Sequence, residues 1–350
     1  MVENISIKNF KSIKDLTLKT SRVNIFIGEH NSGKSNILEA LSWFSINSLA
    51  QDVFPEIFRF KTATDFFYDS DASKPLEIKT DELSFFLRYA KNENGALMNY
   101  IEGFIYPTKS EIHANEIYDF HNIHNKLTDH NFYAFRLSFD GQIDHIAGGQ
   151  LSSPFKTYSF KKLKKFQNNF RPFLNPPYGD NIPSLLVSNK EYRDLVSSIF
   201  KEKGFRLMLK PTEVDINMAK DIEDELYVYP YTSISETLQR IIFYLLAIET
   251  NKNSSLIFDE PESNTFPMYT KQLAEIISLD DSNQYFIATH DPYLLASLIG
   301  KTPIKDLSVF VTEMDSNYDT KVTNVPSDRF SEIMDKGFDV YFNLDKLTHK

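Results

Sequence analysis

The amino-acid sequence predicts an α/β fold built on a largely parallel sheet, and three segments support that prediction. The apolar run Val23 to Ile27 leads into the glycine-rich stretch GEHNSGKS, and helical spacing of apolar residues follows. A second apolar run, SLIFDE, ends in two carboxylates, and a third, QYFIATH, ends in a threonine and a histidine. Strand, glycine loop and helix in this order are typical of a phosphate-binding unit whose functional residues collect at the carboxyl ends of the strands.

Composition places the chain among globular proteins and excludes several classes. Of its 350 residues, 41% are apolar and 25% are charged. No apolar run approaches the ~20 residues that span a bilayer, and the start lacks the apolar core of a signal peptide, so we expect a cytoplasmic protein without membrane contact. The absence of cysteine excludes disulfides and thiolate metal sites. A formal net charge of −10 argues against a surface that attracts nucleic acid everywhere, although a local basic groove stays open.

The first half of the chain reads as strands followed by an irregular segment. Alternating apolar and polar residues over Ile5–Phe10 and Leu16–Leu18 indicate an opening pair of strands. LSFFLRY and YIEGFIY indicate antiparallel strands, and a helix is predicted from Lys190 to Lys203. We interpret residues 108–227 as a mainly helical insertion that splits the core into residues 1–107 and 228–350.

Regular structure returns after the insertion. The stretch SETLQRIIFYLLAIETNK predicts a helix, with Ser233 as its N-cap and Glu236 as the capping-box partner. An amphipathic helix is predicted over Tyr269–Ile277. A hairpin of Leu307–Glu313 with Lys321–Val325, followed by a short helix, closes the chain.

The segment GEHNSGKS matches G-x-x-x-x-G-K-[ST] at every fixed position and predicts a nucleotide site. The backbone N–H groups of such a loop, and the N-terminus of the helix after it, attract phosphate oxygens. Lys34 supplies a point charge for the β- and γ-phosphates, and Ser35 supplies a hydroxyl ligand for Mg²⁺. We therefore expect ATP and Mg²⁺ as ligands. The predicted nucleotide-binding residues of this segment are Gly28, Glu29, His30, Asn31, Ser32, Gly33, Lys34, Ser35 and Asn36.

The two later strands deliver the catalytic candidates. Asp259 ends an apolar strand and is predicted to hold the Mg²⁺ shell together with Ser35. Glu260, one residue further, is predicted to polarise the attacking water. His290 follows Thr289 at the end of the next strand, where an imidazole can bond the γ-phosphate or order that water. Glu260 and His290 are therefore the predicted catalytic residues.

The set GEHNSGKSN, SISETLQR, LIFDEPE and IATHD resembles the RecF/SMC-like and OLD-like ABC ATPases, as does the opening ISIKNFKSIKDLTL. The resemblance covers about residues 1–50 and 228–310. It implies a P-loop NTPase of the ABC ATPase type, hydrolysis of ATP, and a signature segment that contacts the γ-phosphate held by the opposite subunit. Ser233, Ile234, Ser235 and Glu236 align with that signature. Ile234 and Ser235 stand where the signature has its two glycines. Simple helix capping by Ser233 is the alternative interpretation.

The resemblance also implies partners. A site completed by a second subunit requires a homodimer or a higher homo-oligomer. Compact members of this family occur in bacterial anti-phage systems beside a separate effector, a nuclease or toxin, and the residues after His290 are too few for the Toprim nuclease domain of OLD proteins. Two other functions stay open. One is a RecF-like repair ATPase that binds DNA directly, and the other is a transporter's nucleotide-binding subunit, which the missing LSGGQ disfavours.

Three further features each allow two interpretations. The stretch Lys156–Phe173 holds six cations interleaved with aromatics, and it is either a nucleic-acid surface or a solvated basic face over core aromatics. Asp65, Asp69 and Asp71 form either a loop near the metal or an acidic turn beside a strand. Lys11 either contacts the nucleotide or lies on the surface.

Overall fold

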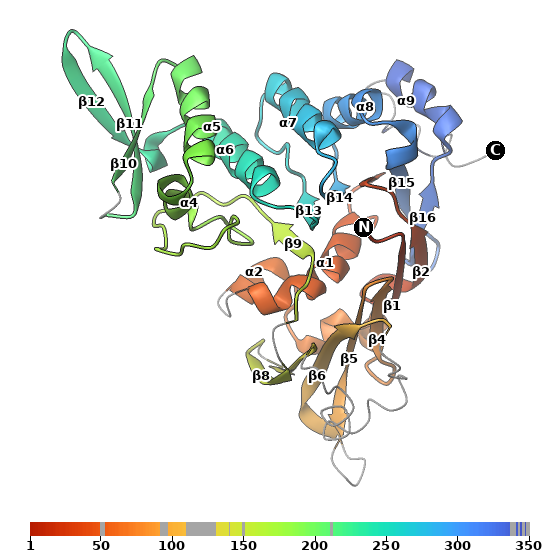
Figure 1. Ribbon diagram of the computed structural model, residues 1–350. Helices are drawn as coiled ribbons and strands as arrows, with labels where there is room; N and C mark the ends of the chain where they lie inside the picture. The colour runs from red at the N-terminus through yellow and green to blue at the C-terminus, as the bar shows by residue number, and fades with distance from the viewer. Residues whose placement is uncertain are drawn as a thin grey trace.

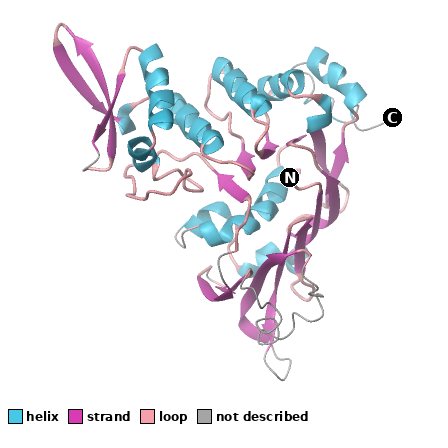
Figure 2. Cartoon of the chain, viewed as in Figure 1, coloured by secondary structure: helices cyan, strands magenta, loops and turns pink. Residues whose placement is uncertain are grey.

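The computed structural model describes residues 1–49, 53–91, 97–109, 131–139, 141–148, 151–210 and 213–336, together with residues 341, 344 and 347. Within these residues the chain forms a six-stranded sheet, a seven-stranded sheet and a three-stranded sheet, with helices around the first (Figure 1). Figure 2 shows strands and helices mixed along the chain, so the predicted α/β class is confirmed.

The six-stranded sheet is the core that carries the predicted motifs. Its strand order is β16-β15-β3-β14-β13-β9, and its pairs are parallel except that β16 runs antiparallel to β15. The central strands are covered on both faces, which explains why each reads as a continuous apolar run rather than an alternating one. The bounds are β3 (Val23–Gly28), β9 (Phe155–Tyr158), β13 (Ser255–Asp259), β14 (Gln284–Ala288), β15 (Leu307–Met314) and β16 (Thr320–Asn324).

Helices cover the two faces of the core sheet and create two hydrophobic clusters. In β3, Ile25 and Ile27 pack into the cluster formed with α6, α7 and α8, whereas Phe26 packs into the cluster that contains α1. This alternation follows from the two-residue repeat of a strand. The helix bounds are α1 (Lys34–Ser42), α2 (Phe54–Ile57), α4 (Ile182–Ser188), α5 (Lys190–Glu202), α6 (Glu236–Glu249), α7 (Pro267–Leu279), α8 (Pro292–Lys301) and α9 (Phe330–Lys336).

The seven-stranded sheet is antiparallel and packs beneath α1. The opening strand pair predicted from the sequence is confirmed, because β1 and β2 pair from Asn4 with Lys19 to Phe10 with Ile13. Trp43, just after α1, is fully buried and stacks on Phe85 of this sheet with ring centroids 4.8 Å apart. The bounds are β1 (Asn4–Phe10), β2 (Ile13–Lys19), β4 (Leu76–Thr80), β5 (Leu83–Lys91), β6 (Leu97–Pro107), β7 (Tyr133–Ser138) and β8 (Ile143–Gly148).

The expectation that residues 108–227 are mainly helical is wrong for the part of that segment that the structure describes. β7 and β8 continue the antiparallel sheet, and β9 joins the core sheet beside β13. A third sheet consists of β10 (Arg206–Lys210), β11 (Asp215–Ile222) and β12 (Glu225–Pro230). Only α4 and the correctly predicted α5 are α-helices there. β9 pairs with β13, which lies far away in the sequence, so local periodicity could not reveal that strand, whereas β7–β8 and β10–β11–β12 are local hairpins that the sequence analysis did not recognise.

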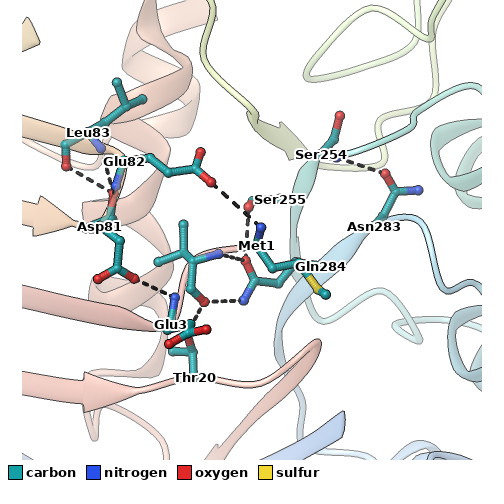
Figure 3. Close-up of polar contacts among 12 residues, drawn as sticks. Met1, Glu3, Thr20, Asp81, Glu82, Leu83, Ser254, Ser255, Asn283 and Gln284 are labelled. Atoms are coloured by element: carbon teal, nitrogen blue, oxygen red, sulfur yellow. Dashed lines mark hydrogen bonds and ion pairs between the residues drawn. The ribbon is translucent and has the colours of Figure 1, made fainter. Parts of the chain in front are cut away.

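The first residues of the chain join the antiparallel sheet to the core sheet (Figure 3). The Val2 N–H donates to Gln284 Oε1 at 2.9 Å, and the Val2 carbonyl accepts from Gln284 Nε2 at 2.7 Å. On the other side, the Glu3 N–H donates to Asp81 at 2.7 Å. Gln284 is buried and begins β14, so these bonds hold β1 against the strand whose far end leads to Thr289 and His290.

Candidate active site

The glycine-rich loop connects the carboxyl end of a parallel strand to a helix N-terminus. β3 ends at Gly28, and α1 begins at Lys34. Gly33 precedes the helix with φ 98°, a left-handed conformation that favours glycine, and an added Cβ would lie 2.1 Å from Thr320 Oγ1. Since Gly33 has no side chain, none caps the first turn of α1. The first-turn N–H groups therefore suit an anion.

Lys34 is buried and lies folded over the loop. Its Nζ donates to the carbonyl oxygens of Gly28 at 2.9 Å and Glu29 at 2.7 Å. Burial lowers the pKa of Lys34 to about 8, and the negative charges of Asp259 and Glu260 partly offset that effect. The structure thus brings the predicted lysine into electrostatic range of both predicted carboxylates.

Ser35 and Asp259 meet, as the prediction of a shared metal site requires. Asp259 lies at the carboxyl end of β13 and reaches solvent, and the Ser35 side chain is near enough to lower the pKa of its carboxylate. Desolvation by the surrounding protein raises the pKa of Asp259, and the negative charge of Glu260 raises it too. The Ser35 side chain lowers it. Among the described residues no three His, Asp or Glu side chains gather as metal ligands do. A hydroxyl and a carboxylate oxygen nevertheless fit Mg²⁺, which commonly completes its shell with phosphate and water oxygens.

Glu260 and His290 also come together. Glu260 has φ 46°, and its N–H donates to the Ala288 carbonyl of β14 at 2.9 Å. His290 Nε2 lies 3.4 Å from Glu260 Oε1, and the His290 ring stacks on His30 with centroids 4.5 Å apart. Burial lowers the pKa of His290, as do Lys34 and His30, whereas Glu260 opposes the shift. His290 is therefore mostly neutral at pH 7 and can donate or accept a proton.

Glu262 is a residue of this site that the sequence analysis missed. It is buried, and its Oε1 accepts from the Thr289 hydroxyl and, at 3.3 Å, from the His290 N–H. Its Oε2 has no hydrogen-bond partner among the described residues, and burial raises the pKa of Glu262 to about 7. The only sequence signal was a third acid in DEPE, which resembles an exposed turn. Glu262 holds the segment that carries His290.

The remaining predicted loop residues divide into exposed and anchored positions. Glu29, His30 and Asn31 are exposed, and Asn31 has φ 62°. The Ser32 hydroxyl is bonded at 2.6 Å to the Thr312 hydroxyl of β15. Asn36 donates from Nδ2 to the Ser12 hydroxyl at 2.8 Å. Ser32 therefore holds the loop against β15, and Asn36 holds the start of α1 against the turn between β1 and β2.

The prediction that Ser233 caps the helix at residue 236 is wrong. Ile234 is extended and its side chain is buried, so α6 begins later, and Ser235 is the N-cap that accepts from the Leu238 N–H at 3.4 Å. Ser233 lies in a single 3₁₀ turn and donates to the Pro230 carbonyl at 2.7 Å. Both serines are exposed and make these bonds within their own segment. Neither bond links them to the glycine loop of the same chain.

Two of the open alternatives now have structural contacts. Lys11 is largely buried and forms an ion pair with Glu39 of α1, so it is not a surface lysine. Asp65 accepts from the N–H groups of Lys61 and Thr62 at 2.8 and 3.0 Å, as an acid in a turn does. These bonds favour the acidic turn over a loop near the metal.

Comparison with known proteins agrees with this geometry. Residues 1–146 match the family profile described as an AAA ATPase domain. A solved SMC head, bound to the C-winged helix domain of ScpA, is 15% identical, with a TM-score of 0.50 over 95% of this chain and 99% of that chain. The fold is that of an ABC-type P-loop ATPase.

Two further proteins are similar to this chain. An SMC head with an extended coiled coil, bound to the C-terminal domain of ScpA derived from Pyrococcus furiosus, is 12% identical with a TM-score of 0.47, covering 96% of this chain and 99% of that chain. The uncharacterised protein MJECL10 of Methanocaldococcus jannaschii is 32% identical over 110 residues, or 28% of this chain. The chain spans 50% of the length of that relative. Among the described residues, no helix is both long and apolar enough to cross a membrane.

Proposed function

We propose that this chain is an ATP-hydrolysing switch that dimerises around ATP and controls a nucleic-acid-directed effector protein, in the manner of OLD-like ATPases of bacterial anti-phage defence. The observation that carries the proposal is the convergence of Lys34, Glu260 and His290 from the ends of three neighbouring parallel strands. The effector and the anti-phage role rest on the resemblance of the sequence motifs to that family.

Phosphate binding would use the positive groups around the loop. The first turn of α1 and the ammonium group of Lys34 offer N–H donors and positive charge to phosphate oxygens. Ser35 and Asp259 would hold Mg²⁺, which supplies further positive charge there when it is bound.

Hydrolysis would depend on Glu260 and its neighbours. The Glu260 carboxylate can orient a water molecule and accept its proton, while Ser263 donates to Glu260 Oε2 at 3.2 Å and keeps the group in place. Neutral His290, held by its contacts with Glu260 and His30, can donate to a phosphate oxygen or to the same water. Glu262 fixes the backbone of His290, and so acts through it.

A second subunit would complete each site. The start of α6 presents the exposed Ser233 and Ser235 and the positive end of a helix of 14 residues. Neither serine is bonded to the glycine loop of its own chain, which fits a role toward the phosphate of another chain. ATP would then join two chains head to tail, and hydrolysis would release them, which gives a two-state element for an effector to recognise.

Mixing two inactive variants tests the shared site. Lys34→Ala removes the phosphate lysine, and Ser233→Arg blocks the start of α6 at an exposed position that tolerates a larger side chain. In a mixed dimer one site carries both defects and the other carries neither, so ATPase activity should return in part on mixing. Two variants with defects in the same element, Lys34→Ala and Ser35→Ala, should not complement. Absence of recovery in demonstrated heterodimers would show that each chain hydrolyses ATP alone.

A RecF-like ATPase that binds DNA directly is the second candidate, and the segment after β9 favours it. Lys162, Lys164, Lys165 and Arg171 are exposed, as is the ring of Phe170. The rest of the stretch is structural, since Lys156 donates to Asn251 and lies over the Phe173 ring, and Lys161 forms an ion pair with Glu56 at 2.6 Å. An exposed aromatic among cations suits single-stranded nucleic acid.

Neutralising this exposed patch should weaken DNA binding. In a triple variant with glutamine at positions 162, 164 and 165, the slope of log affinity against log salt should fall by about 2–3, because each phosphate contact contributes roughly 0.7–0.9. The matched control neutralises three exposed lysines elsewhere, Lys271, Lys301 and Lys305. Fluorescence anisotropy over a salt series measures both. Equal affinity and slope in the two triple variants would leave the segment a solvated basic face.

A further inference from the structure

The three-stranded sheet of β10, β11 and β12 projects from the rest of the chain as an arm (Figure 1). β12 is one of its two edge strands, and all six of its residues are exposed. Four consecutive large apolar or aromatic residues of β12 have between 38% and 51% of their surface in solvent. They are Leu226, Tyr227, Val228 and Tyr229.

We expect an exposed, apolar edge strand such as β12 to be covered by another polypeptide strand in the assembled protein. Since side chains alternate along a strand, Leu226 and Val228 lie on one face of the arm, and Tyr227 and Tyr229 lie on the other. Exposed edges are usually protected by charges, proline or a bulge, because their free N–H and C=O groups attract other strands. In β12 the protecting residues, Glu225 and Pro230, stand only at its two ends.

The charges of the arm limit how another strand can pair with it. The turn between β11 and β12 is acidic, with Glu223, Asp224 and Glu225 in succession, while the nearby Asp221 forms an ion pair with Arg206 of β10. Two arms aligned in parallel would bring two acidic turns side by side. Two arms aligned antiparallel would place the turns at opposite ends and leave only the uncharged residues between them, so the strand is complementary to itself.

We propose that β12 pairs antiparallel with β12 of a second copy of this chain, around a two-fold axis at Val228. In this register Val228 faces the partner's Val228, and Tyr227 faces the partner's Tyr229. A two-fold axis perpendicular to the sheet keeps like faces together, so the two arms form one continuous six-stranded sheet, because each arm contributes three strands. This contact needs no nucleotide and goes beyond the ATP-bridged dimer of the proposed function.

A single introduced thiol tests the register, because the chain has no cysteine of its own. Directly opposed residues of antiparallel strands have Cβ atoms about 4.5–5.5 Å apart, within reach of a disulfide after slight adjustment. Val228→Cys in the nucleotide-free chain of 350 residues should therefore form a disulfide-linked dimer under mild oxidation. Leu279→Cys is the matched control, since Leu279 is 77% exposed and lies at the end of α7, away from the arm. Equal rates of cross-linking in the two variants would overturn the proposal.

A charge at the same position tests the contact without oxidation. Val228→Lys places two ammonium groups opposite each other, so the nucleotide-free protein should sediment as a monomer at concentrations where the wild type and Leu279→Lys are dimers. Retained ATP binding shows that the variant is folded. A wild-type chain that is monomeric without nucleotide would refute the pairing, and β12 would then be a surface for a different protein. Either result is independent of the mixing experiment, which reports on the ATP site alone.

Discussion

Glu260→Gln should bind ATP with nearly wild-type affinity and hydrolyse it ~10²–10⁴ times more slowly, the usual effect of losing a general base. The amide keeps the shape of the side chain and can still accept from Ser263 and contact His290. It cannot accept a proton from water as a carboxylate does. The chemical step is measured by single-turnover hydrolysis, and binding is measured by calorimetry.

Changes of two other acids are compared with this variant. Asp259→Asn should raise the Mg²⁺ concentration needed for activity, because Asp259 lies beside Ser35 and the two are the predicted protein ligands of the metal. Glu275→Gln changes a partly exposed acid on α7 that pairs with Lys301 at 3.2 Å, and it should leave turnover unchanged. Wild-type single-turnover rates in Glu260→Gln would remove Glu260 from the mechanism.

Lys34→Ala should abolish tight ATP binding. Lys34 is the cation that the glycine loop holds beside the start of α1, and a hydrogen bond to a charged group contributes about 1.5–3 kcal/mol, or roughly 10–150-fold in affinity. Truncation also leaves the Gly28 and Glu29 carbonyls without this donor, so Lys34→Met, which keeps most of the volume, separates loss of charge from collapse of the loop. Unchanged affinity by calorimetry in both variants would refute the assignment of the loop.

The pH dependence of binding gives a second measurement on the same lysine. The pKa of Lys34 in the free protein is about 8 because of burial. Above that pH the Lys34 amine is neutral in the free protein, and it must bind a proton before it can attract a phosphate. The ATP affinity of the wild type should therefore fall as pH rises through 8. Lys34→Met lacks this group, and its weak affinity should stay flat over the same range.

The sequence by itself determined the central unit of this protein. The order of strand, glycine loop and helix was predictable because Val23–Gly28 is apolar throughout and the loop motif is contiguous. The ends of β13 and β14 were predictable for the same reason, since each short apolar run delivers its polar residues at the carboxyl end. Properties of neighbouring residues were sufficient to predict these features.

Only the tertiary structure decided the features that depend on residues far apart in the chain. Glu262 looked like part of an exposed turn, and its burial comes from packing against the segment of Thr289 and His290. β9 became a strand because β13, far away in the sequence, was there to pair with it, and the hairpin of β7 and β8 was added to the edge formed by β6. The N-cap of α6 is Ser235 rather than Ser233, because Ile234 is extended and packs into the core. In each case the free energy comes from burial and pairing across the fold, which no local window of sequence contains.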